Sequence, residues 1–343
     1  MGSLAIERVD ASASELAARS RAWDADRGED ARLTIGSPSD EAIVLGAFQR
    51  ASELEGQRVG AAGVDAPLAV LRRGSGGAAA RVGPGCVWLQ LSLARPDALV
   101  ACTADKILNR YVRPLLRALT RAASVPASWF GRDWISAAHR PVALVALAHD
   151  AAANRALFEA IVGVSASVAC GDRPSFLGKA PATLDEIAGR AVDPARVATL
   201  AAEAYAAAAT SLVEASAAGG APRGAPASGV EASAARGAAR VPASGVEVGD
   251  PAWAAIREEA IGVVAAGRDV AGRLRVGGEL MASRDALARL EDLVAALPSG
   301  AGAAEVGRAV DVALTTPGAV TFGVRAFVSL RDAIVDALRS PAP

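Results

Sequence analysis

Short apolar runs separated by glycine, proline and polar residues predict β-strands in the first half of the chain. A polar and alanine-rich segment precedes them, within which Ser12–Trp23 is expected to form a helix. Ala137–Pro141 is expected to be the turn between two of the strands. The predicted strands are Ala42–Gly46, Pro67–Leu71, Cys86–Leu93, Trp134-Ile135, Val142–Leu147 and Phe158–Val164.

The pattern becomes helical between Pro96 and Ala122, where large apolar residues recur at four-residue intervals. Pro114 is expected to bend this element or to split it into two helices. Arginines occupy the opposite side of the same element, at positions 110, 113, 117 and 121. They form either a solvated face or a surface for an acidic partner. Further helices are predicted over residues 196–217.

Residues 218–249 divide the chain into two predicted domains, 1–217 and 250–343. This segment is rich in Ala, Gly, Pro and Ser and contains Pro-Ala-Ser-Gly-Val-Glu twice, which is typical of a flexible linker. In the second domain, Leu274–Val276 is a predicted strand and Ser283 a predicted helix cap. Another helix is expected to start at Ser329.

Composition narrows the classes of function. The formal net charge of −1 gives no electrostatic case for binding nucleic acid or an acidic membrane surface. Cys86, Cys102 and Cys170 are isolated and only two histidines accompany them, which predicts reduced thiols, no zinc site and a cytoplasmic location. Neither a signal peptide nor a membrane span is expected, because charged residues interrupt the apolar runs.

The stretch from Arg72 to Gly85 carries the strongest chemical signal. Glycine and alanine over Ser75–Ala79 would let backbone N–H groups approach a ligand closely. Arg72 and Arg73 lead into this loop, and guanidinium groups hold carboxylates or phosphates through paired hydrogen bonds. The pattern favours an anion-binding loop no more than an ordinary glycine-rich turn between two strands.

Three segments together resemble the lipoate–protein ligase family, which is related to biotin ligases and octanoyltransferases. Gly46-Ala47-Phe48-Gln49 is similar to the Gly-x-x-Gln element of that family. Arg72 to Ala79 is similar to its Arg-Arg-x-Ser-Gly-Gly-Gly-Ala loop, and Gly131-Arg132-Asp133-Trp134 to its Gly-Arg-Asn-Asp strand. The order and spacing are also similar, and the resemblance covers roughly residues 15–210.

The resemblance implies an α+β fold for residues 1–217, with mixed and antiparallel sheets flanked by helices, and a small α/β accessory domain over 250–343. It implies ATP and Mg²⁺ as cofactors of an active enzyme and lipoate or octanoate as ligand. The implied partner is a lipoyl-carrier domain of the glycine cleavage H protein or dehydrogenase E2 type. The implied acyl- and nucleotide-binding residues are Arg72, Arg73, Ser75, Gly76, Gly77, Ala78 and Asp133.

The resemblance fails at the residue on which the chemistry of the family depends. That reaction joins a carboxylate to ATP and then transfers the acyl group to a carrier lysine, and a fixed cation stabilises the developing negative charge. The family supplies the cation as the lysine of a Gly-Arg-Lys-Ile-Ala-Gly element. The same gap-free register gives His139-Arg140-Pro141-Val142-Ala143-Leu144 here, so Pro141 replaces the lysine. Losing one such contact costs on the order of a hundred- to a thousand-fold in rate.

Other positions depart as well. Trp134 replaces an aspartate, Ala78 the third glycine of the loop, and Val82 a common histidine, and the family's His-Gly-Thr strand is not recognisable in residues 155–164. We therefore assign no catalytic residue with the family's role.

Lys179 and Arg140 are weak substitutes for the missing cation, and Lys106 is expected to face solvent. His139 and His149 are weak candidate bases, with His149 expected just past a strand and exposed. Cys86 is expected to be an inert buried thiol, and Ser124–Ser128 lacks the cysteine of cysteine-type octanoyltransferases.

Three hypotheses follow. The chain is a ligase-like binding protein for an acyl group, its adenylate or a carrier domain, with ligase activity lost or weak. Alternatively, it is an active lipoate or octanoate ligase or acyltransferase with a relocated cation. The third hypothesis is a non-catalytic interaction scaffold.

Overall fold

The computed structural model describes residues 3–25, 30–54, 68–170, 176–218, 253–259, 261–298, 300–324 and 327–340. In this part of the chain a large mixed sheet has the strand order β1-β2-β6-β10-β9-β8-β7. β1 and β2 run parallel and each of the other neighbouring pairs is antiparallel. The bounds are β1 (Leu4–Ala11), β2 (Ala31–Pro38), β6 (Cys86–Leu93), β7 (Ala127–Ser128), β8 (Trp134–Ala137), β9 (Arg140–Asp150) and β10 (Arg155–Gly163).

A small three-stranded sheet holds the glycine-rich loop. Its order is β4 (Ala69–Arg72), β3 (Ala42–Leu45) and β5 (Ala80–Val82), with β3 parallel to β4 and antiparallel to β5. The prediction of a simple strand–turn–strand unit is therefore corrected. The loop connects two strands on opposite sides of β3, and β6 belongs to the other sheet.

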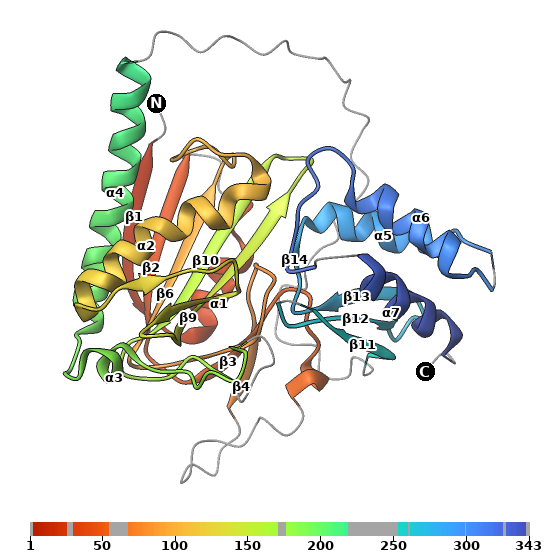
Figure 1. Ribbon diagram of the computed structural model, residues 1–343, viewed down its shortest axis with the longest axis horizontal. Helices are drawn as coiled ribbons and strands as arrows, with labels where there is room; N and C mark the ends of the chain where they lie inside the picture. The colour runs from red at the N-terminus through yellow and green to blue at the C-terminus, as the bar shows by residue number, and fades with distance from the viewer. Residues whose placement is uncertain are drawn as a thin grey trace.

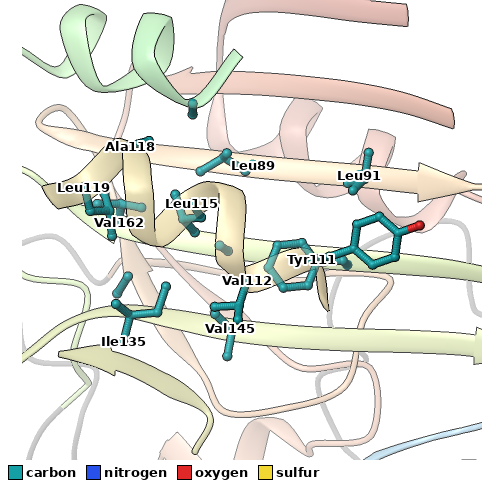
Figure 2. Packing of buried hydrophobic residues seen from close by; sticks show 14 of the residues in the cluster. Leu89, Leu91, Tyr111, Val112, Leu115, Ala118, Leu119, Ile135, Val145 and Val162 are labelled. Carbon is teal, nitrogen blue, oxygen red and sulfur yellow. The ribbon is translucent and has the colours of Figure 1, made fainter. Parts of the chain in front are cut away.

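One face of the large sheet is covered by α2 (Ile107–Ala123) and α4 (Pro194–Ala218), which lie side by side in Figure 1. Leu115 and Leu119 of α2 point toward the sheet, where Leu89, Val145 and Val162 meet them (Figure 2). The Tyr205 hydroxyl of α4 donates to the Tyr111 carbonyl at 2.7 Å.

Two predictions about this element are corrected. Helix α2 starts at Ile107, after a short 3-10 turn (Ala104–Lys106), rather than at Pro96. The split predicted as one outcome at Pro114 does not occur, because one helix continues through this buried proline. Contacts with the sheet and with α4 stabilise the helix on both sides of the proline, and they outweigh the backbone hydrogen bond that proline cannot make. The arginines at 113, 117 and 121 are exposed, as a solvated face requires.

The opposite face is covered by α1 (Ala13–Arg21) and the small sheet. Ser12 caps α1 in a reciprocal pair with Glu15. Leu16 of α1 reaches down to β2 because Gly36 has no side chain: a Cβ there would lie 2.4 Å from a Leu16 methyl carbon. β1 and β2 were not predicted, although Ala31–Ile35 alternates between apolar and polar residues as a half-buried strand does.

The β8–β9 hairpin confirms two predicted strands with a shorter turn, formed by Ala138 and His139 at positive φ. The remaining elements here are a 3-10 turn (Ala51–Leu54) and α3 (Leu184–Ala188). The prediction for His149 is wrong: it lies within β9 and is 1% exposed.

The C-terminal part has its own hydrophobic core between an antiparallel sheet and three helices (Figure 1). Its elements are β11 (Ala255–Glu258), β12 (Val263–Arg268), β13 (Leu274–Gly278), β14 (Met281–Ala282), α5 (Arg284–Ala295), α6 (Ala303–Leu314), β15 (Thr321–Phe322) and α7 (Phe327–Arg339). The predicted start of the last helix, Ser329, is two residues late. Beyond its first residue, the linker predicted over 218–249 lies outside the described residues.

Contacts join the C-terminal part to the large sheet. Ser283 lies beside His149 of β9, with 2.8 Å between its Oγ and the imidazole Nδ1. The predicted cap role of Ser283 is corrected in part: it occupies the N-cap position of α5, but its hydroxyl makes no capping bond and accepts instead from the Val320 N–H at 2.9 Å. No described helix is long and apolar enough to cross a membrane.

Candidate functional site

The glycine-rich loop is organised from inside by Arg73. Arg73 is 1% exposed, and its guanidinium donates to the Ser75 hydroxyl at 2.9 Å. It also donates to the backbone carbonyls of Gly76, at 2.9 Å, and Ala78, at 2.7 Å. Arg73 therefore fixes the course of the loop, with its donors directed to the protein's own oxygens.

Arg72 closes the neighbouring turn in a similar way. Its guanidinium donates to the Gly46 carbonyl at 3.1 Å and to the Gln49 carbonyl. The Gln49 side chain accepts from the Gly46 N–H at 2.9 Å. Gly46 must be glycine here, because a Cβ would lie 2.0 Å from the Gly77 carbonyl oxygen. The first two sequence motifs are thus brought into direct contact.

The loop amides also point at protein carbonyls. The Gly76 N–H donates to Leu147 of β9 at 2.9 Å, and the Gly77 N–H donates to Leu280 at 3.0 Å. Gly77 has a φ of +88°, which favours glycine. A Cβ on Gly76 would lie 2.4 Å from the Leu280 carbonyl oxygen, so the segment before β14 lies directly against the loop. Ser75, Gly76, Gly77 and Ala78 are all buried.

Beneath the loop lies a fully buried glutamate, Glu159 of β10, which was not predicted from the sequence. It accepts from the Ser75 hydroxyl and, at 2.9 Å, from the Trp88 indole N–H. Burial raises the pKa of Glu159, and the nearby Arg73 charge opposes that rise. A lone glutamate in the apolar strand Arg155–Gly163 was the available signal for a buried polar contact.

The β8–β9 hairpin carries the third motif. Asp133, 1% exposed, directly precedes β8, and its backbone carbonyl accepts from Val145 at 2.8 Å. The glycine loop bonds to Leu147, two residues further along the same strand, so both motifs border β9. Pro141 is buried at the start of β9, where its carbonyl accepts from Ala182 at 2.8 Å.

The space between the two sheets is filled by apolar side chains next to this hairpin. Trp134 and Leu144 are opposite each other in the β8–β9 register and are 3% and 5% exposed. They belong to a cluster with Trp88, Ile161 and Phe176, in which Phe176 meets Trp134 edge-on at 6.2 Å.

The lysines and the arginine that the sequence suggested as weak substitutes for the family's lysine lie in different surroundings. Arg140 donates to the Pro181 carbonyl at 2.8 Å and pairs with Glu186 at 2.7 Å, on the outside of the hairpin. Lys179 Nζ lies 6.0 Å from the centre of the Trp134 ring. Lys106 is exposed and pairs with Asp105.

Neither histidine nor Cys86 is placed in this structure as a catalytic base or nucleophile. His139 is exposed in the hairpin turn, whereas burial lowers the pKa of His149. Burial raises the pKa of the Cys86 thiol to about 11, which keeps it protonated at neutral pH. Among the described residues, no group of three His, Cys, Asp or Glu side chains is placed to hold a metal ion.

Comparison with known proteins gives likenesses in fold alone. No family model and no curated sequence match this chain. Among solved structures, P. falciparum LipL1 in complex with lipoate has a TM-score of 0.44 and 11% identity over 61% of this chain and 63% of that one. The match thus spans less than two thirds of LipL1.

Two further solved structures are similar at comparable levels. The bipartite lipoate protein ligase of Thermoplasma acidophilum, solved with its E2 lipoyl domain, has a TM-score of 0.43 and 14% identity over 60% of this chain and 83% of that one. Biotin protein ligase from Aquifex aeolicus has a TM-score of 0.35 and 12% identity over 62% of this chain and 72% of that one. In these comparisons the chain is similar in fold to lipoate–protein ligases and biotin protein ligase over about three fifths of its length.

Proposed function

We propose that this chain is a lipoate–protein ligase-like protein that binds a lipoyl or octanoyl group, or a lipoyl-carrier domain, without catalysing acyl activation by ATP. The observation that carries the proposal is that the glycine-rich loop already makes its hydrogen bonds within the protein. Its two central amides and the Arg73 guanidinium all donate to protein oxygens.

A nucleotide phosphate does not fit this arrangement. A phosphate needs several donors directed at one open point, as in other glycine-rich phosphate loops. Here the Gly76 and Gly77 amides are held by Leu147 and Leu280, and the latter residue lies directly over the loop. An adenylate would therefore have to displace buried backbone hydrogen bonds, each worth about 0.5–1.5 kcal/mol net.

The hairpin supports the same conclusion. Pro141 supplies neither a charge nor an N–H at the position where relatives in the family carry lysine. Arg140 is next to it, but its guanidinium is bonded to the Pro181 carbonyl and Glu186. The cation that would stabilise charge on phosphate and carbonyl oxygens is therefore missing from this position.

The binding part of the proposal rests on the retained segments Gly46–Gln49 and Arg72–Ala78, and the solved structures similar in fold include one with lipoate and one with an E2 lipoyl domain. Apolar side chains fill the region next to Trp134 and Leu144. An acyl chain would replace some of these contacts, whereas a carrier domain would need only the surface.

Two assays test the proposal. ATP–pyrophosphate exchange with lipoate and with octanoate should stay at background for the wild-type chain and for Arg117→Gln, a control on the far side of the sheet. Thermal unfolding should shift upward with lipoate, octanoate or a purified E2 lipoyl domain; a ligand at a hundred times its Kd stabilises by about 2.7 kcal/mol. Exchange above background would overturn the loss of activity, and the absence of any thermal shift would overturn the binding role.

A second candidate, an active ligase with a relocated cation, is favoured by one contact. Lys179 lies over Trp134, next to the hairpin that lacks its lysine. This candidate predicts exchange activity that Lys179→Met abolishes, while Lys106→Met, at an exposed lysine, leaves it unchanged. The scaffold hypothesis predicts neither exchange nor stabilisation by an acyl ligand.

A further inference from the structure

The two faces of the large sheet differ in chemistry. The face under α2 and α4 is apolar along every central strand, with residues such as Leu33, Leu91 and Phe158. The other face begins with an apolar row that crosses the sheet through Gly36, Trp88, Ile161, Leu144 and Trp134. That row packs under α1 and the small sheet.

The next two rows on this face are polar near the β1 edge. Strand register places Glu7 opposite Thr34, and Thr34 opposite Gln90. One row further along, Arg32 lies opposite Ser92. Hydrogen-bonding side chains on three adjacent strands of one sheet face are unexpected in a core, because covering them costs desolvation.

A cavity lies over these rows. It has a volume of about 480 Å³ and is bounded by the polar residues of β1, β2 and β6 and by the last turn of α1. Arg19 of α1 forms part of its wall, and Trp23 and Leu157 form an apolar side. This volume is in the range of small-molecule sites.

Several polar groups at the cavity retain hydrogen-bonding capacity. The side-chain amide of Gln90 donates to the Leu16 carbonyl at 2.8 Å, which fixes its orientation. Within the described residues, the Gln90 side-chain oxygen and the hydroxyls of Thr34 and Ser92 have no hydrogen-bond partner, although Thr34 and Gln90 are only 6% and 4% exposed. Buried polar groups are normally satisfied, so Thr34 and Gln90 are suited to a bound molecule or to water, and the half-buried Ser92 hydroxyl is open to the same partners.

The charged side chains at the cavity indicate the charge of its ligand. Arg19 uses one terminal nitrogen on both carboxylate oxygens of Glu7, each at 3.0 Å, and its other N–H groups have no partner among the described residues. Arg32 also lines the cavity. Guanidinium groups bind carboxylates through paired hydrogen bonds.

We propose that this cavity binds a small hydroxylated carboxylic acid of the sugar-acid type. Its carboxylate bonds to Arg19, and its hydroxyl groups bond to Thr34, Gln90 and Ser92. The carbon skeleton lies against Trp23 and Leu157. The proposal is independent of the ligase-like role, because it involves neither the glycine-rich loop nor the β8–β9 hairpin.

Titration calorimetry of the full chain with glucuronate and gluconate tests the site. At least one should bind saturably, and glucose, which lacks the carboxylate, should bind about tenfold more weakly or worse. Arg19→Gln and Thr34→Val should weaken the sugar acid about tenfold and severalfold, respectively. The matched controls Arg117→Gln and Thr210→Val, on exposed helix surfaces on the other side of the sheet, should leave it unchanged.

Absence of saturable binding of both sugar acids would overturn the proposal. So would glucose binding as tightly as the sugar acids, or sugar-acid affinity that is unaffected by both cavity substitutions. Ser92→Ala, at a partly exposed position, gives a second measure of hydroxyl recognition if Thr34→Val does not fold. None of these results depends on ATP–pyrophosphate exchange, so the site and the proposed function can fail separately.

Discussion

Replacement of Ser283 by alanine tests how firmly the C-terminal part is attached to the large sheet. Ser283 is fully buried, and its hydroxyl bonds both the Val320 N–H, at 2.9 Å, and His149 Nδ1, at 2.8 Å. Its hydroxyl makes no capping bond to α5, so the cost is that of these two contacts alone. Leaving a buried polar group unsatisfied costs about 1–3 kcal/mol. Two such groups sum to about 2–6 kcal/mol. Few single substitutions cost more than about 4–5 kcal/mol, so Ser283→Ala should lower the free energy of unfolding by about 2–4 kcal/mol.

Urea unfolding followed by tryptophan fluorescence measures this loss, and thermal unfolding gives a second estimate. For a chain of this size each kcal/mol corresponds to roughly 2–4 °C in Tm. Ser39→Ala is the matched control, because Ser39 is exposed in the bend after β2 and should change stability by less than about 0.5 kcal/mol. If Ser283→Ala is no more destabilising than this control, the buried serine–histidine contact does not stabilise the junction.

Three further changes have definite expected outcomes. Gly46→Ala places a Cβ 2.0 Å from the Gly77 carbonyl oxygen and should destabilise the chain by about 1–3 kcal/mol in urea unfolding; an unchanged midpoint would contradict the close approach. Burial raises the pKa of the Glu159 carboxyl from its ordinary 4.5. Between pH 4.5 and the raised pKa, the folded state keeps the carboxyl proton that the unfolded state has lost, so stability should fall as pH rises through this range. The free energy of unfolding of the wild type minus that of Glu159→Gln should therefore decrease over this window, and a pH-independent difference would refute the raised pKa. Tyr205→Phe removes the hydrogen bond to the Tyr111 carbonyl and should lower the free energy of unfolding in urea by about 0.5–1.5 kcal/mol. An unchanged free energy of unfolding would show that this bond does not stabilise the pairing of α2 and α4.

The pattern of apolar and polar residues along the sequence was sufficient to predict several of the strands and helices. Cys86–Leu93 and Val142–Leu147 are apolar runs of strand length, and both form strands of the large sheet. The four-residue spacing of Ile107, Tyr111, Leu115 and Leu119 likewise specifies the buried side of α2. These features were predictable because periodicity and chain geometry act between near neighbours.

The candidate site depended on contacts between distant segments. The sequence showed two arginines and a glycine-rich loop, but not that Arg73 would turn inward to the loop carbonyls or that Leu280 would cover the Gly77 amide from about two hundred residues away. The resemblance predicted Pro141 in place of a lysine, and only the folded hairpin placed Arg140 against Glu186.

By itself the sequence determined many of the strands and helices, because periodicity and backbone preference act over a few residues. β1 and β2 were recognised only in the structure. The tertiary structure decided which donors remain available to a ligand. Glu159, Thr34 and Gln90 are ordinary polar positions in the sequence, and register across β1, β2, β6 and β10 brings them together on one sheet face. Hydrogen-bonding capacity is set by whichever groups lie within about 3 Å, and only the packed chain brings those groups together.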